Sequence, residues 1–192
     1  MACRNPGAAS GQANAFTPQS PWLDLVNSEM WDGFGRHTDH LCEPRWAREF
    51  LKRCRIDANA LDPGEAHAQL KALRHFLREA AQKVAATGAM DRQGVAKLNA
   101  FLEARGRLQV SLKDKMLTTA FEPLRRDWKW VEGRICLSYI EALQNSVRIK
   151  ICPNTGCNWA FFDRTKGNIR KWCNDRACGN RDRVRRARAR QG

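Results

Sequence analysis

The sequence predicts an α+β fold: a mostly helical N-terminal domain with a β-hairpin, followed by a small four-cysteine module with a C-terminal basic helix. Three observations predict it. Apolar residues recur at helical spacing through most of the chain, one segment alternates with period two, and two close cysteine pairs lie near the C-terminus. We expect a flexible N-terminus over 1–20, the helical domain over 21–147 and the cysteine module over 148–192.

The first helices are predicted from their start signals and apolar spacing. Pro44 suits a first helical position. The segment Asp62-Pro63-Gly64-Glu65 combines a capping residue with a proline and an acidic first turn, and Thr87-Gly88 ends that helix. Asp91 caps another helix, which Gly106 stops. The residues expected to point inward from these three helices are Trp46, Phe50, Leu51 and Cys54, then Leu70, Leu73, Leu77, Ala80 and Val84, and finally Val95, Leu98 and Leu102.

The period changes after Gly106. Residues 107–112 alternate apolar and polar, Lys113-Asp114 can turn, and 116–121 continue extended until Pro123, which predicts a β-hairpin. A final helix is expected from about Asp127 to Leu143, leading directly into the cysteine module.

Charge is distributed unevenly along the chain. The 192 residues carry 34 Lys and Arg against 20 Asp and Glu, a net charge of +14, which argues against an ordinary near-neutral metabolic protein and favours a polyanionic partner. Residues 147–192 contain 13 basic and 3 acidic side chains, so a net +10 lies in about a quarter of the length. The 43% hydrophobic content is enough for a core. No apolar run reaches the ~20 residues of a membrane span, and 1–21 lack the apolar core of a signal peptide, so we expect no membrane partner and a cytoplasmic location.

The eight cysteines divide along the same line. Cys3, Cys42, Cys54 and Cys136 are scattered and are expected to be buried free thiols. Cys152, Cys157, Cys173 and Cys178 form two C-x4-C pairs separated by fifteen residues, with Pro153 and Gly156 suited to a tight turn. Two disulfides or four independent thiols are the alternatives. A reducing compartment disfavours the disulfides, and the paired spacing disfavours independent thiols. The pattern therefore predicts one structural Zn²⁺ held by four thiolates, with no open position for a catalytic water.

The rest of the module is predicted to form a treble-clef-like zinc finger. An aromatic run at 158–163, a turn at Gly167-Asn168 and a second run at 169–172 are typical of a β-hairpin between the cysteine pairs. The residues after Cys178 contain no proline and predict a helix. Without the metal, so small a module is not expected to hold its fold.

Here the residues carry a resemblance. Cys178-Gly179-Asn180-Arg181, preceded by Arg170-Lys171-Trp172-Cys173 and Phe162-Asp163, resembles the CGNR zinc-finger family. Trp22-Leu23-Asp24-Leu25-Val26-Asn27-Ser28 and Asp39-His40-Leu41 resemble the opening of the ABATE domain, described as a putative stress-induced transcription regulator, which typically precedes that finger. Asn174-Asp175-Arg176 departs from the expected small or apolar residues but keeps the ligand spacing. The resemblance implies a stress-response regulator whose finger binds DNA.

The basic residues of the finger support DNA binding independently. Arginine forks bind phosphate oxygens and guanine edges bidentately. A passive solvated tail and an acidic protein partner are the alternatives, and Trp159, Phe161 and Phe162 can either stack on bases or form a small core beside the metal. The predicted nucleic-acid-binding residues are Arg164, Lys166, Arg170, Lys171, Arg181, Arg183, Arg185, Arg186, Arg188 and Arg190.

The N-terminal domain offers weaker functional signals. It contains no G-x-G-x-x-G, P-loop or G-x-S-x-G motif, and we predict no catalytic residue and no enzymatic activity. Asp24 and Asn27 are polar positions on an apolar segment and are expected to make internal hydrogen bonds; a ligand pocket of Asn27, Arg36 and Asp39 is the alternative. A ligand-binding protein or enzyme with a purely structural finger, and a protein-interaction adaptor, stay open as other functions. Homodimerisation and an unidentified small-molecule effector also stay open.

Overall fold

The computed structural model describes residues 20–31, 36–56, 61–103, 106–113, 116–145, 148–154 and 156–190. The predicted flexible N-terminus, apart from Ser20, and Cys3 lie outside these residues. The N-terminal body contains the helices α1 (Pro21–Val26), α2 (Pro44–Arg53), α3 (Ala66–Thr87), α4 (Arg92–Leu102) and α5 (Trp128–Gln144). Two short strands, β1 (Glu29–Trp31) and β2 (His37–Asp39), pair antiparallel, and the 3₁₀ turns η1 (His40–Cys42) and η2 (Pro63–Glu65) precede α2 and α3.

The helix boundaries follow the local signals in the sequence. Asp62 accepts a hydrogen bond from the Gly64 N–H at the start of η2, and Asp91 accepts one from Gly94 at the start of α4. Asp127 caps α5 in the same way through the Trp130 N–H. Gly88, with φ +77°, ends α3 in the left-handed conformation that glycine adopts without steric cost.

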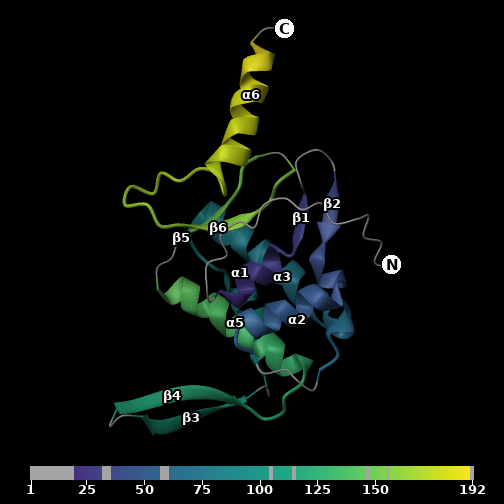
Figure 1. Cartoon of the computed structure of the whole chain (residues 1–192). Coiled ribbons are helices and arrows are strands. Elements are labelled where there is room, and N and C mark those ends of the chain that lie inside the picture. Colours follow the sequence, from purple (N-terminus) through teal and green to yellow (C-terminus); the bar gives the residue numbers. More distant parts are fainter. Residues whose placement is uncertain are drawn as a thin grey trace.

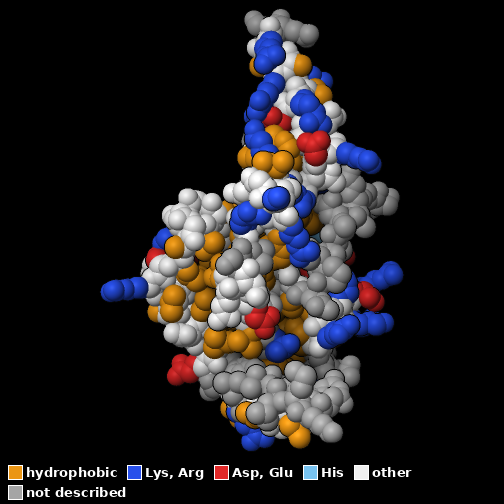
Figure 2. Space-filling model, turned by 90° about the vertical axis from the view of Figure 1, so that its left-hand side faces the viewer, with side chains coloured by type: hydrophobic (Ala, Val, Ile, Leu, Met, Phe, Trp, Pro, Cys, Tyr) orange, Lys and Arg blue, Asp and Glu red, His pale blue; other side chains and the backbone are white. Residues whose placement is uncertain are grey.

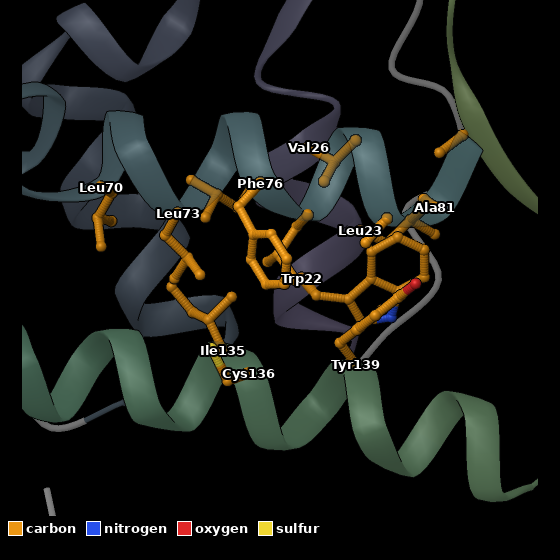
Figure 3. Packing of buried hydrophobic residues seen from close by; sticks show 14 of the residues in the cluster. Trp22, Leu23, Val26, Leu70, Leu73, Phe76, Ala81, Ile135, Cys136 and Tyr139 are labelled. Carbon is orange, nitrogen blue, oxygen red and sulfur yellow. The ribbon is translucent and has the colours of Figure 1, made fainter. Parts of the chain in front are cut away.

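The hydrophobic core lies between α1, α3 and α5, as Figure 3 shows. Trp22 of α1 is fully buried and meets the Tyr139 ring of α5 edge to face, with ring centroids 4.9 Å apart. The predicted stripe of α3 is buried throughout, from Leu70 to Val84. On α4 only part of the prediction is confirmed: Leu98 is buried, but Val95 is 47% exposed because α4 packs on the body through a narrower face than its apolar spacing indicates.

The predicted hairpin after α4 is confirmed. Strands β3 (Gly106–Lys113) and β4 (Met116–Pro123) pair antiparallel from Gly106↔Pro123 to Lys113↔Met116. Figure 1 shows this hairpin as an arm that extends from the end of the body opposite α6.

The C-terminal module contains β5 (Arg148–Ile151), β6 (Ala160–Asp163), the π-helical turn η3 (Asp175–Gly179) and α6 (Asn180–Ala189). The predicted hairpin between the cysteine pairs is wrong in its second strand. β6 pairs with β5, which lies before the first cysteine, and 169–172 form no strand. This pairing places the first cysteine pair in the hairpin's own turn and lets Ile149 and Phe162 enter the body core.

The fold class is thus the predicted one, a helical α+β body followed by a four-cysteine module that ends in a helix. Ile149, Ala160 and Phe162 belong to the same hydrophobic cluster as the helices of the body, so the module is anchored to it. Cys54 and Cys136 are free thiols as expected, whereas Cys42 is disulfide-bonded, which makes the free-thiol prediction wrong at that position. Within the described ranges, no helix is long and apolar enough to cross a membrane.

Candidate metal centre and nucleic-acid interface

The Sγ atoms of Cys152, Cys157, Cys173 and Cys178 all lie within 4.8 Å of one another, and all four residues are buried. The Sγ of Cys173 is 3.7 Å from that of Cys157 and 3.6 Å from that of Cys178, and Cys157 and Cys178 are 3.6 Å apart. A tetrahedral Zn²⁺ with Zn–S bonds of about 2.3 Å has S···S edges of about 3.8 Å. The four sulfurs therefore fit a single structural zinc site.

The first cysteine pair is positioned by the β5–β6 hairpin. The Cys152 N–H donates to the Trp159 carbonyl at 2.8 Å, which continues the strand pairing to the metal site. The Cys157 N–H donates to the Asn154 carbonyl, which closes a tight turn between the two cysteines. Gly156 has φ +78°, a conformation that favours glycine, and this confirms the turn expected at that residue.

The second pair is positioned by η3. The Cys178 N–H donates to the Asn174 carbonyl, and the Asn174 side chain caps the turn by accepting from the Ala177 N–H. The Asn154 amide donates to the Cys178 carbonyl at 2.8 Å and so joins the two cysteine turns. A Cβ at Gly179 would lie 2.3 Å from Asp175 Oδ1 and 3.0 Å from the Trp172 ring, so any other residue here would force the Asp175 side chain to shift.

Two arginines of the predicted nucleic-acid-binding set make hydrogen bonds within the finger itself. The Arg181 guanidinium donates to the Cys178 Sγ at 3.1 Å. The Arg170 guanidinium donates to the carbonyls of Phe162, Trp172 and Cys173 and stacks on the Phe161 ring, 4.7 Å from its centroid. These contacts show that Arg170 and Arg181 support the finger.

The loop after β6 is organised by the buried Asp163. Its carboxylate accepts hydrogen bonds from the Lys150 ammonium, the Arg170 N–H and the Thr165 N–H and hydroxyl. Burial works against the charged form, but the hydrogen bonds from Lys150 and Thr165 outweigh it and hold the pKa of Asp163 well below its usual range. Lys150 also donates to the Asn168 and Arg170 carbonyls, so one ion pair fixes the whole loop.

The exposed basic surface lies along α6, where Figure 2 shows Lys and Arg side chains over the helix. The buried Asp182 pairs with Arg185 at 2.7 Å and with Arg186 at 2.8 Å, while the side chains of these arginines stay 66% and 58% exposed. The Arg185 hydrogen bond lowers the pKa of Asp182 despite its burial. Arg183 pairs with Asp175 at 3.3 Å. Arg188 and Arg190 are exposed and, among the described residues, have no carboxylate partner.

The remaining predicted residues of the finger are exposed on the loop that follows β6. Arg164 lies over the Phe162 ring, 5.8 Å from its centroid, and Lys171 lies 4.9 Å from the Trp172 ring. Lys166 is exposed as well. Sequence reasoning missed two basic residues: Lys150, which fixes the loop, and the exposed Arg176. Arg176 could have been found from the sequence, because it lies between the two cysteines of the last pair. No local sequence pattern marks Lys150.

In the body, the ligand pocket of Asn27, Arg36 and Asp39 stays a prediction; among the described residues, Asn27 borders a cavity beside the finger that Arg36 and Asp39 do not line. The Asn27 amide donates to the Ala160 carbonyl and accepts from the Ala160 N–H, both at 2.9 Å, so the internal hydrogen bonding expected of Asn27 is confirmed. It joins the body to the finger. Asp39 is bound by the buried Arg74 through two hydrogen bonds of 2.5 and 2.7 Å. Arg36 is exposed at the start of β2.

Comparison with known protein families identifies both parts of the chain. Residues 19–130 match the ABATE family, described as "Putative stress-induced transcription regulator", and residues 148–191 match the CGNR zinc finger. No curated protein matches the chain. The described roles of Gly179 and Arg181 account for two residues of the Cys-Gly-Asn-Arg motif that gives the finger its name. The family descriptions point to a regulator and not to an enzyme. The ABATE match spans more than half of the residues, and the chain therefore belongs to the ABATE family, with a CGNR zinc finger at its C-terminal end.

Proposed function

We propose that the protein is a zinc-dependent, DNA-binding transcription regulator in which the finger contacts DNA. The observation that carries the proposal is the placement of α6. Figure 1 shows this helix extending away from the body; its arginines from Arg183 to Arg188 are exposed, and so is Arg190, which follows its last residue. Packing of the helix within its own protein does not explain this exposed positive surface, whereas a polyanion such as DNA binds it strongly.

The dimensions of α6 suit the major groove of DNA. An α-helix with its side chains is about 10–12 Å across, and the major groove is about 12 Å wide. The ten residues of α6 extend about 15 Å at 1.5 Å per residue, so the helix reaches several base pairs. The long arginine side chains on its sides then reach the phosphates that border the groove.

The ion pairs of α6 order the arginines without neutralising the surface. Asp182 forms ion pairs with Arg185 and Arg186, and the side chains of both arginines stay exposed enough to bind a second partner. We therefore assign the leading phosphate contacts to Arg185, Arg186, Arg188 and Arg190. Arg164, Lys166 and Lys171 form a second basic surface on the loop that follows β6. In this proposal the body senses a ligand or dimerises. The two hydrogen bonds between the Asn27 amide and the Ala160 backbone, which we call the Asn27 clamp, transmit the state of the body to the finger.

Salt-dependent DNA affinity tests the proposal. Binding of the full zinc-loaded chain to a labelled duplex of random sequence is measured by fluorescence anisotropy between about 50 and 300 mM salt. If about six basic groups neutralise phosphates, log K falls against log salt with a slope near about −5. Replacing Arg185, Arg186, Arg188 and Arg190 together with Ala should reduce this slope by up to about four and weaken binding at least about 100-fold.

A second variant controls for net charge. Arg45, Arg48, Lys52 and Lys71 are exposed residues of α2 and α3, and replacing these four with Ala removes the same charge from the body. We expect DNA affinity close to that of the unaltered protein. Equal losses in both variants would mean that total charge, and not α6, determines binding. Unchanged binding of the α6 variant would overturn the proposal.

A further inference from the structure

A cavity of about 480 Å³ lies between α1 and the finger. One wall comes from the body, through Leu23, Asp24 and Asn27, and the other comes from the finger, through aromatic and basic side chains. Its volume lies within the range of about 300–1,000 Å³ typical of small-molecule sites. The two walls belong to the parts of the chain that match two different families.

The charged groups around the cavity favour an anion. Arg164, Arg170 and Arg176 border it, and none of the three has a carboxylate partner among the described residues. The two carboxylates at the cavity are already paired, since Asp24 contacts Arg53 at 3.7 Å and Asp175 contacts Arg183 at 3.3 Å. An anion in the cavity would therefore meet guanidinium groups whose charge no protein carboxylate neutralises.

One of these guanidinium groups is held rigidly before any ligand binds. Arg170 uses three of its N–H groups on carbonyl oxygens and is stacked on Phe161. Because its position is fixed, a ligand would not have to immobilise this side chain, which lowers the entropic cost of binding. Arg164 and Arg176 are exposed and can adjust to the anion.

Aromatic side chains form part of the finger wall, which also includes Ala160, Cys173, Asn174 and Asp175. Trp159, which is half-buried, borders the cavity together with Phe161 and Phe162. An indole ring beside guanidinium groups binds a planar ring by stacking while the arginines bind the anionic group. Aliphatic anions would leave the aromatic surface in contact with water.

We propose that this cavity binds a small organic anion that carries an aromatic ring, of the chemical class of the nucleoside monophosphates. Arg164 and Arg176 bind the anionic group, Trp159 contacts the ring, and Arg170 supplies a fixed positive charge. Because the ligand contacts α1 and the finger together, it stabilises the arrangement in which Asn27 clamps Ala160. The site itself does not depend on DNA binding; its effect on DNA affinity rests on the proposed function.

Calorimetric titration of the full zinc-loaded chain with adenosine 5′-monophosphate, at about 150 mM salt, tests the site. We expect one equivalent to bind with a Kd below about 1 mM, and adenosine or inorganic phosphate alone to bind at least about tenfold more weakly. Replacing Arg164 and Arg176 with Gln should weaken binding at least about tenfold. The matched control replaces Arg188 and Arg190 with Gln, which removes the same charge from α6 and should leave the affinity unchanged.

Three results would overturn the site: no binding of the nucleotide at about 5 mM, equal affinity in the Arg164→Gln/Arg176→Gln variant, or equal loss in the α6 control. Phosphate binding as tightly as the nucleotide would overturn the requirement for a ring. The effect of the nucleotide on DNA binding is tested by measuring DNA affinity with and without the nucleotide. We expect a change of about fivefold or more in the unaltered protein and no change in the Arg164→Gln/Arg176→Gln variant. If DNA affinity does not change, the regulatory effect is wrong and the site stands. If no DNA binds, the proposed function fails while the calorimetry still reports on the site.

Discussion

The body and the finger are stabilised by different means. The body buries large apolar side chains from several helices, such as Trp22, Leu77 and Tyr139. The buried cluster around the metal centre consists of four cysteines and Phe161, with Trp159 and Trp172 partly buried against it. We expect hydrophobic burial to be enough to keep the body folded. It is not expected to be enough for the cluster around the metal centre, because so few apolar groups are removed from water there. We therefore expect metal dependence to be a local property of this chain.

The boundary between these two modes of stabilisation does not fall between the two family matches. The first cysteine pair lies between strands β5 and β6, yet Ile149 of β5 and Phe162 of β6 pack in the body core. We therefore expect the residues that depend on the metal to be the cysteine turns, the loop after β6, η3 and α6. The hairpin should behave as part of the body.

Zinc removal should have the largest effect. Replacing Cys173 with Ser removes one of four ligands, and we expect less than one equivalent of zinc by metal analysis and loss of amide protection over 164–190. Structural zinc contributes about 10–16 kcal/mol of apparent binding free energy in small fingers, and that stabilisation is lost. Amide exchange should stay slow in α3, α5 and the β5–β6 hairpin.

Cys136 provides the control, because it is fully buried in α5 and belongs to the body core and not to the cluster of the metal ligands. Cys136→Ser should keep one equivalent of zinc and destabilise the body instead. Loss of protection in α3 and α5 after Cys173→Ser would contradict the independence of the body core.

The Asn27 clamp should have the next largest effect. Asn27→Ala leaves the buried N–H and C=O of Ala160 without partners, and each unsatisfied group costs about 1–3 kcal/mol, so we expect a loss of about 2–6 kcal/mol in the free energy of unfolding. Urea denaturation measures this loss. Asn145→Ala is the matched control, since its amide makes one exposed hydrogen bond to the Glu141 carbonyl and its loss should cost less than about 0.5 kcal/mol. Equal losses of unfolding free energy in Asn27→Ala and Asn145→Ala would contradict a stabilising role of the Asn27 clamp.

Features with a local cause could be predicted from the sequence. The capping residues Asp62, Asp91 and Asp127 act within three residues of their partners, and the α3 stripe repeats within single turns. The two cysteine pairs identify the metal site for the same reason, since each pair forms within one turn of the chain. The family resemblance added the order of the two parts.

Features that depend on distant partners could not be predicted. The 148–151 and 169–172 segments are both short, basic and partly apolar, and β6 pairs with the first because that hairpin also packs on the body. Ten basic residues of the finger look equivalent in the sequence, and only three-dimensional contacts show that Arg170 binds carbonyl groups and Arg181 binds a sulfur. The partner of Asn27 lies 133 positions away.

The charge of Asp24 should have an intermediate effect that depends on pH. Burial raises the pKa of Asp24 to about 6 from 3.8, although Arg53 opposes the shift. The folded protein therefore binds this proton more tightly than the unfolded chain, and stability falls as pH rises from about 4 to about 6. Asp24→Asn should remove this dependence and raise the free energy of unfolding at pH 7 by up to about 3 kcal/mol, the equivalent of two pKa units. Denaturation of both proteins at pH 4.5 and pH 7 measures it; a gain at pH 4.5 as large as at pH 7 would contradict the assignment.

Substitution of Arg181 should have the smallest effect, and it separates a role in the metal centre from a role in DNA binding. The sequence places it among the DNA contacts, whereas its guanidinium lies 3.1 Å from the Cys178 sulfur. If it serves the metal, Arg181→Met should weaken zinc binding about 10-fold, at the low end of what outer-shell contacts contribute, and leave DNA affinity nearly unchanged once zinc is saturating. Arg188→Met should do the reverse, because Arg188 is an exposed α6 residue without a carboxylate partner among those described. A chromophoric chelator measures zinc affinity and anisotropy measures DNA affinity in each variant. Loss of DNA affinity in Arg181→Met at saturating zinc would return Arg181 to the DNA surface, and would mean that one arginine contacts both the metal centre and the nucleic acid.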